Sequence, residues 1–369
     1  MSSATNKEWL SQIPMFFIVG RSRSGTTLLR TLFDAHPNVI MPFESPFIWV
    51  LRNKYGKRKH WTIKHLTSFY HDLYKTNWKF KLWPVDKEKL LSDLLSLEGK
   101  TDYLTVCKCV HANYISTFQK KEIKWIGDKN PKYSIRLKTI EKMFPEVRYV
   151  HIIRDYRDHL YSMLKVNFLG SVIPEILYQW KYSARTVESF RKKKPEKIIS
   201  IRYEELAKEP ERVFGEICRF LNIPYEPSVL DFYKHEQEIK NSLDAGLLDK
   251  FQKSLFNPIN TGRIKNWEGK LNEQIIKMAD TIVGKYAERN GYERIYKKTD
   301  IQTVIRIIPR ITIIRLYYLY RWTIGIFPSE IKAGIKRKLP SLPRLYFAIF
   351  PQDKKQFDGE QEKFSFRRG

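Results

Sequence analysis

Residues 15–34 join a short apolar run to a polar turn and then to an amphipathic segment. The run from Met15 to Val19 is short and apolar enough for a buried parallel strand, and apolar residues recur at helical spacing between Leu28 and Phe33. Where such a strand turns into such a helix, consecutive backbone N–H groups point outward and the helix dipole favours negative charge. The segment therefore predicts a strand, an anion-binding loop and a helix.

The residues of the turn narrow the choice of anion. Gly25 permits close backbone approach, and the hydroxyls of Ser24, Thr26 and Thr27 add hydrogen-bond donors, so the loop suits a phosphate or a sulfate. A nucleotide-hydrolysing P-loop carries a lysine directly after its second glycine, whereas Thr26 stands there in this chain. A magnesium triphosphate site is therefore not expected.

The string R-S-G-T-T-L-L-R, followed by D-A-H-P, resembles the cofactor loop of sulfotransferases that use 3'-phosphoadenosine 5'-phosphosulfate (PAPS). Within that family the chain is most similar to the tyrosylprotein, carbohydrate and lipid branches and resembles a bacterial member. The resemblance extends over residues 14–295. It implies that the loop binds the cofactor through Arg21, Ser22, Arg23, Ser24, Gly25, Thr26 and Thr27.

A second anion site is expected at residues 147–163, where another apolar strand ends in Arg154 and Ser162 follows eight residues later. The resemblance implies that these two residues hold the 3'-phosphate. The planar guanidinium of arginine suits phosphate oxygens, and a strand end directs it toward the edge where α/β sheets bind ligands. An ion-paired surface cluster, R-D-x-R-D, is the alternative interpretation.

Further positions carry the same resemblance. Lys129 follows the expected strand over 123–127 and corresponds to the lysine near the sulfuryl group, while Tyr203 opens the segment similar to the adenine-contacting loop. Arg263 and Lys265 lie in a segment similar to the loop that closes over the cofactor.

The implied chemistry assigns roles to the cations and needs a base. An acceptor oxygen attacks sulfur in line, and Arg23 and Lys129 are expected to stabilise the charge that develops on the departing phosphate.

Glu44 is the first candidate for the base, because it follows the loop by the same interval as the catalytic glutamate of the tyrosylprotein branch. Burial by Phe43 and Phe47 is expected to raise its basicity. His111 is the rival base, as in cytosolic sulfotransferases for phenols and steroids. Pro46 replaces a basic residue of the peptide-sulfating branch, which argues against an acidic tyrosine peptide as the acceptor.

Strands that alternate with helices predict an α/β protein, a three-layer P-loop-like fold with a central parallel sheet. We expect a sulfotransferase domain over residues 1–299, with a helical, aromatic-rich insertion at 44–120. A mainly helical, basic C-terminal extension over residues 300–369 is expected to follow. The aromatic residues of the insertion are either core residues or the lining of an apolar acceptor cleft.

The charge of the chain predicts an anionic partner, because its formal net charge is +27. Residues 301–350 hold nine Lys or Arg and one Glu, interleaved with large apolar side chains, and are too charged to span a bilayer. This pattern indicates peripheral contact with a membrane surface, or a helical subdomain with a solvated basic face. No recognised nucleic-acid module is present, so specific nucleic-acid binding is not expected.

The expected activity is sulfuryl transfer from PAPS to a hydroxyl of a lipid, sterol or glycan, with release of 3'-phosphoadenosine 5'-phosphate (PAP) and without a metal. The alternatives are a non-catalytic PAP- or PAPS-binding protein and a basic nucleic-acid-binding protein. The three cysteines form no disulfide or zinc pattern, and the first residues are polar. A cytoplasmic protein, peripheral at the inner membrane, is therefore expected.

Overall fold

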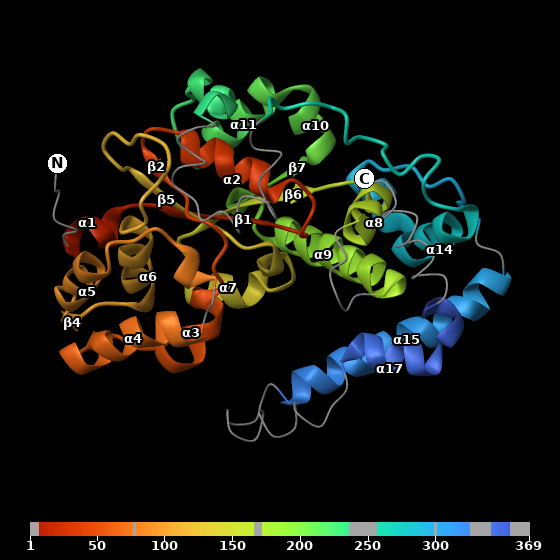
Figure 1. Cartoon of the computed structure of the whole chain (residues 1–369), viewed down its shortest axis with the longest axis horizontal. Coiled ribbons are helices and arrows are strands. Elements are labelled where there is room, and N and C mark those ends of the chain that lie inside the picture. Colours follow the sequence, from red (N-terminus) through yellow and green to blue (C-terminus); the bar gives the residue numbers. More distant parts are fainter. Residues whose placement is uncertain are drawn as a thin grey trace, which may run out of the picture. The chain divides into compact units, whose positions relative to one another are not determined.

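The computed structural model describes residues 7–76, 79–165, 172–235, 257–298, 301–324 and 341–354 (Figure 1). The chain divides into two compact units: one consists of Met1–Ile153 with Thr186–Thr261, and the other of Arg154–Arg185 with Gly262–Gly369. The second unit thus joins two segments from before residue 300 to the C-terminal segment. The expected domain boundary at residues 299 and 300 stays a prediction.

The first unit is built on a five-stranded sheet in the order β2-β5-β1-β6-β7, in which all neighbours are parallel. Its strands are β1 (Met15–Gly20), β2 (Val39–Ile40), β5 (Trp125–Lys129), β6 (Arg148–Ile153) and β7 (Ile198–Arg202). Every residue of β1 is buried, as expected for the central strand of a sheet covered on both faces. The predicted α/β fold with a central parallel sheet is confirmed.

Helices fill the connections between these strands. The helices of this unit are α1 (Lys7–Gln12), α2 (Thr26–Ala35), α3 (Phe47–Tyr55), α4 (Ile63–Thr76), α5 (Lys87–Leu95), α6 (Tyr103–Ala112), α7 (Leu137–Met143), α10 (Tyr203–Lys208) and α11 (Pro210–Leu221). Short 3₁₀ helices are η1 (Phe80–Leu82), η2 (Pro131–Ile135), η3 (Pro195–Lys197) and η4 (Pro227–His235), and a two-stranded antiparallel sheet pairs β3 (His60–Trp61) with β4 (Gly99–Lys100).

Two neighbouring residues of β1 show that helices cover both faces of the sheet. The ring of Phe16 lies 4.7 Å from that of Phe33 in α2, which in turn lies 4.9 Å from Phe214 in α11. Phe17 points to the opposite face and stacks on Phe144, directly after α7, at 6.2 Å. Figure 1 shows α2 and α11 on one side of the sheet and α7 on the other. The three layers therefore follow from the alternation of side chains along one strand.

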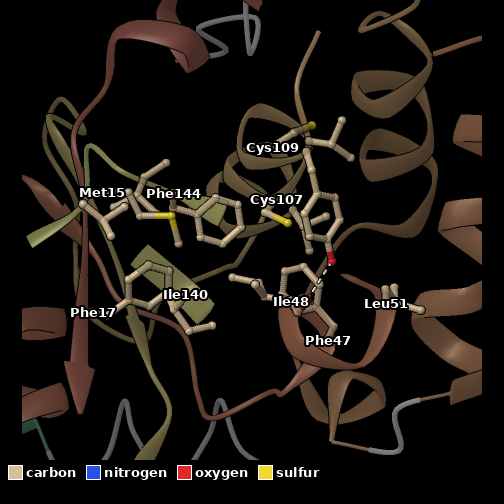
Figure 2. Packing of buried hydrophobic residues seen from close by; sticks show 14 of the residues in the cluster. Met15, Phe17, Phe47, Ile48, Leu51, Cys107, Cys109, Ile140 and Phe144 are labelled. Atoms are coloured by element: carbon tan, nitrogen blue, oxygen red, sulfur yellow. Dashed lines mark hydrogen bonds between the residues drawn. The ribbon is translucent and has the colours of Figure 1, made fainter. Parts of the chain in front are cut away.

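The predicted insertion is mainly helical and contributes to the core below the sheet. Figure 2 shows residues of β1 and α7 facing residues of α3 and α6 in one apolar cluster. Phe69, Phe80 and Trp83 are buried in that cluster, so these aromatics are core residues and do not line a cleft. Trp78 lies outside the described residues. The three cysteines are free and buried.

The second unit is helical in its described part. It contains α8 (Tyr156–Lys165), α14 (Glu273–Val283), η6 (Gly284–Tyr286), η7 (Glu288–Asn290), α15 (Ile301–Ile324) and α17 (Leu342–Ile349), and α9 (Ile173–Lys193) begins in it. Its C-terminal helices share a small apolar cluster that contains Val172, Ile314, Leu342 and Tyr346. Among the described residues, no helix combines the length and the apolar character needed to cross a membrane.

Candidate active site

The residues singled out in the sequence follow the strands of the sheet at their carboxyl ends. In sheet order, Glu44 follows β2, Lys129 ends β5, the loop 21–25 follows β1, and Tyr203 follows β7. Arg154 is the residue that comes directly after β6 in the chain and belongs to the second unit. Ligands of parallel α/β sheets bind outside this carboxyl edge, so we take it as the candidate active site.

The loop after β1 turns tightly through two left-handed residues. Arg23 has a φ of 71° and Gly25 a φ of 93°, and the N–H of Ser24 donates to the carbonyl of Arg21 at 3.2 Å. No side chain caps α2, whose first turn also lacks an acidic residue. The first N–H groups of α2 are therefore left for a ligand, in a region of positive helix dipole. The left-handed arginine is a strained feature of the kind found at ligand-binding loops.

Close packing makes glycine necessary at the end of β1 and again in the turn that follows it. A Cβ atom at Gly25 would lie 2.5 Å from Cδ2 of Tyr203, and one at Gly20 would lie 2.4 Å from the carbonyl oxygen of Ile152. The ring of Tyr203 therefore lies directly against the loop. The structure thus brings together two predicted cofactor-binding residues that are far apart in the chain.

Ser24 supplies a test of whether the loop suits an anion. Its side chain is only 1% exposed, and its hydroxyl has no hydrogen-bond partner among the described residues. A buried hydroxyl without a partner costs about 1–3 kcal/mol, so such a group is expected to have a ligand. An oxygen of a phosphate or sulfate would satisfy it, and the loop therefore fits the phosphosulfate end of PAPS.

Glu44 lies between two ammonium groups. Lys79 Nζ donates to Oε1 of Glu44 at 2.6 Å, and Lys129 Nζ donates to Oε2 at 3.2 Å. Lys129 is almost completely buried at the end of β5, whereas Lys79 comes from the insertion, just before η1, and is partly exposed. The structure therefore brings together two side chains, Glu44 and Lys129, for which catalytic roles were expected, and it adds a third group, Lys79, that the sequence did not reveal.

The pKa of Glu44 differs from the sequence-based expectation. Burial alone raises the pKa of this carboxyl, but Lys129 and Lys79 together outweigh burial and lower the pKa to about 2. The expectation that burial by Phe43 and Phe47 raises the basicity of Glu44 is wrong, because the two ammonium groups lower the pKa by more than burial raises it. Phe43 lies under a guanidinium group, and Phe47 packs in the core against aromatic rings. Glu44 is therefore ionised at neutral pH.

The residues predicted for the second phosphate lie together in the second unit. The guanidinium of Arg154 donates to the carbonyl of Arg263 at 2.5 Å and lies 4.0 Å from the carboxylate of Asp158. Asp158 accepts from the backbone N–H of Lys265 at 2.8 Å, and Ser162 lies one turn further along α8 on the same face. Burial raises the pKa of Asp158 to about 6, against the effect of Arg154. The side chains of Arg263 and Lys265 are exposed, and both residues contact this group through their backbones.

A family model described as the sulfotransferase family matches residues 14–227 of the 369 residues. The chain belongs to this family. The resemblance found in the sequence and the predicted enzyme class, a PAPS-dependent sulfotransferase, are thereby confirmed.

Individual relatives of this sulfotransferase are distant. Protein-tyrosine sulfotransferase 1 of Danio rerio is 26% identical over 269 residues, which are 70% of this chain and 67% of the relative. The protein-tyrosine sulfotransferase of Drosophila melanogaster is 26% identical over 286 residues, which are 73% of this chain and 50% of the relative. The chain thus spans between half and two thirds of the length of these two relatives.

The solved structures that resemble this chain are also distant in sequence. A sulfotransferase domain from the curacin biosynthetic pathway matches with a TM-score of 0.49 and 20% identity, over 76% of this chain and 98% of that domain. A retinol dehydratase in complex with retinol and PAP matches with a TM-score of 0.36 and 14% identity, over 76% of this chain and 82% of that protein.

Arg30 of this sulfotransferase holds the segment that carries Glu44. Its guanidinium donates to the carbonyl of Met41 at 2.9 Å and to Asp34 at 2.8 Å, and it lies 4.0 Å from the centre of the Phe43 ring. Both Arg30 and Asp34 are buried. The sequence does carry a signal for this role of Arg30, because Arg30 and Asp34 are opposite charges four residues apart on the otherwise apolar helix after the loop.

His111, the rival base, is buried in α6 with both ring nitrogens engaged. Nδ1 lies 2.8 Å from the carbonyl oxygen of Cys107, and Nε2 lies 3.5 Å from the carboxylate of Asp128. The rings of Phe47 and Trp83 lie 5.3 and 5.4 Å from the imidazole. This environment indicates a packing role for His111, and the choice of base between it and Glu44 stays a prediction.

Proposed function

We propose that this sulfotransferase transfers the sulfuryl group of PAPS to the phenolic hydroxyl of a tyrosine in a polypeptide. The observation that carries the proposal is the Glu44 carboxylate, which follows β2 and is held by Lys79 and by Lys129 at the carboxyl end of β5. Membership of the family supports the reaction, and the protein-tyrosine sulfotransferases among the relatives support the acceptor.

In the proposed step, the acceptor oxygen bonds to sulfur while its proton passes to the carboxylate of Glu44. The bond between sulfur and the 5'-phosphate oxygen breaks, and that oxygen keeps the electron pair, so PAP and a sulfate ester are the products. Lys129, Arg23 and the N–H groups at the start of α2 stabilise the charge on the departing oxygen. An arginine stays protonated, so Arg23 acts through its charge. The assignment of the 3'-phosphate to Arg154 and Ser162 stays a prediction from the resemblance.

The pKa of Glu44 favours a phenol over an aliphatic hydroxyl. A carboxylate with a pKa of about 2 is a weak base, so the proton it accepts must come from an acidic hydroxyl or leave late in the step. The tyrosine hydroxyl, with a pKa of about 10, is far more acidic than the hydroxyl of a sugar or a sterol. A tyrosine hydroxyl can therefore be deprotonated by a weaker base than the hydroxyl of a sugar or a sterol can.

Positive charge around Glu44 also suits a peptide with acidic residues near the tyrosine. Lys132 is exposed, and its electrostatic neighbours include Glu44 and Lys79. Lys79, Lys129 and Lys132 thus surround the single carboxylate of Glu44 and supply the positive charge that Pro46 does not. The argument for a lipid or sterol acceptor loses its support from the insertion, because Phe80 and other aromatics there are buried in the core.

The proposal is tested by incubating the protein with PAPS labelled with radioactive sulfur and a panel of acceptors. The panel holds a tyrosine peptide with acidic neighbours, the same peptide with phenylalanine in place of tyrosine, a simple phenol, a lipid extract and a polysaccharide. We expect label in the tyrosine peptide and none in its phenylalanine counterpart. Label confined to lipid or polysaccharide would overturn the acceptor, and PAP binding without label in any acceptor would support the non-catalytic alternative.

A further inference from the structure

One face of α15 carries a continuous row of exposed apolar side chains. Their exposed fractions range from 56% to 74% in Ile301, Ile305, Ile308, Leu316 and Leu319. These positions are separated by four, three, eight and three residues, and the exposed Thr312 fills the wide interval, so they form one stripe along the helix. We call these five residues the α15 stripe.

Contacts within the second unit fix the orientation of α15 and leave the stripe outward. Ile314 is fully buried with Val172, Leu342 and Tyr346. On the same face, the hydroxyl of Tyr318 is hydrogen-bonded to Glu175 of α9. The packed face and the stripe lie on different sides of one helix, so the stripe cannot be buried by rotating α15 without breaking these contacts. Contiguous apolar surface of this kind usually marks an interaction site.

The charge of the same helix is basic. Arg306 and Arg315 are exposed on α15, whereas Arg310 is paired with Asp353 at 2.6 Å. Residues 301–350 carry nine Lys or Arg against one Glu, within a chain of net charge +27. An apolar stripe beside basic side chains is the pattern of a helix that lies at the interface of an anionic bilayer.

We propose that α15 docks on an anionic lipid surface, with the α15 stripe in the headgroup boundary and Arg306 and Arg315 beside lipid phosphates. The charge of the chain disfavours a second copy as the occupant, because two such basic surfaces would repel each other. A nucleic acid would use the arginines but would leave the aliphatic stripe in water, since single strands bind by stacking on aromatic rings. An anionic bilayer satisfies both observations.

The test is flotation of the full-length protein with vesicles and does not depend on sulfuryl transfer. One vesicle set contains phosphatidylglycerol in phosphatidylcholine and the other contains phosphatidylcholine alone. The test variant combines Ile305→Glu with Ile308→Glu, and the control is Ile295→Glu, at a site of the same unit that is 54% exposed and lies outside α15. A second variant, Leu316→Glu, tests the other end of the stripe. All four positions are exposed, and thermal melts check that each variant is folded.

We expect the wild type and Ile295→Glu to float with the anionic vesicles, and to bind them less as salt is raised. The double variant should lower the vesicle partition coefficient at least about tenfold, because each isoleucine loses an apolar environment. The double variant Arg306→Glu with Arg315→Glu should bind the anionic vesicles less than the wild type does, and its binding to phosphatidylcholine vesicles should not change. Three results would overturn the proposal: no flotation of the wild type, undiminished flotation of the stripe variants, or a wild-type dimer that the stripe variants convert into monomers.

Discussion

Replacing Gly25 by alanine tests whether the ring of Tyr203 closes the anion-binding loop. The φ of 93° at this position costs an L residue about 1–2 kcal/mol. The new Cβ would also lie 2.5 Å from Cδ2 of Tyr203 and 3.0 Å from Cδ1 of Ile152, and overpacking of this kind costs about 1–3 kcal/mol. Gly25→Ala should therefore destabilise the first unit by about 2–5 kcal/mol.

Gly99→Ala is the matched control for the backbone. Gly99 has a φ of 97°, and a Cβ there meets only Lys7 Nζ, at an ordinary 3.8 Å. Alanine lowers the entropy of the unfolded chain equally in both variants, so this effect cancels when they are compared. Gly99→Ala should cost only the backbone strain, about 1–2 kcal/mol.

Denaturant unfolding measures the free energy of unfolding of each variant. Calorimetric titration measures the affinity of the anion-binding loop for PAP. We expect Gly25→Ala to lose more stability than Gly99→Ala and to bind PAP more weakly, while Gly99→Ala binds it as the wild type does. Tyr203→Ala removes the ring that the new Cβ meets, so the loss in the double variant should be smaller than the sum of the losses in Gly25→Ala and Tyr203→Ala. Equal destabilisation by both alanines would refute the close contact between Tyr203 and the loop.

Three other substitutions separate the roles assigned above. Lys79→Ala removes one of the two cations that lower the pKa of Glu44, so the pKa of Glu44 should rise from about 2 toward 4.5. The acid limb of the pH profile of kcat/KM should then move to higher pH. An acid limb that does not move would contradict the pairing of Lys79 with Glu44. Arg154→Ala should weaken PAP binding by about 1.5–3 kcal/mol in calorimetry, the value of a hydrogen bond to a charged group, and unchanged affinity would exclude this arginine from the phosphate site. His111→Ala removes the imidazole beside the buried carboxyl of Asp128 and should cost about 1–3 kcal/mol of unfolding free energy, with the pH profile of the folded fraction unchanged. A folded His111→Ala protein that binds PAP but does not turn over would make His111 the base.

The loop after β1 could be predicted from the sequence because its signals are local. The apolar run, the glycine and the helical spacing all lie between Met15 and Phe33, and the predicted helix follows the loop as α2. The order of the strands could not be predicted in this way. Lys129 lies beside Ile18 in neighbouring parallel strands, although more than a hundred residues separate them in the chain.

Contacts made by the insertion account for what the sequence did not reveal. Lys79 is 35 residues from Glu44 and belongs to no motif, so only the fold shows that it binds this carboxylate. Neighbouring phenylalanines in the sequence suggested an apolar surrounding for Glu44. In the structure Phe43 packs on Arg30, and the carboxylate of Glu44 binds two lysines. The density of aromatics likewise could not distinguish core from cleft, because Phe69 is buried by tertiary packing.

The most direct test of the account is the rate of sulfuryl transfer by Glu44→Gln at saturating PAPS, compared with Glu122→Gln at an exposed surface carboxylate. PAP affinity, measured by calorimetry in the same preparations, shows whether the donor site is intact. We predict that Glu44→Gln binds PAP like the wild type but transfers about 10²–10⁴ times more slowly, as expected for the loss of a general base, while Glu122→Gln keeps the wild-type rate. Full transfer activity in Glu44→Gln would contradict the account.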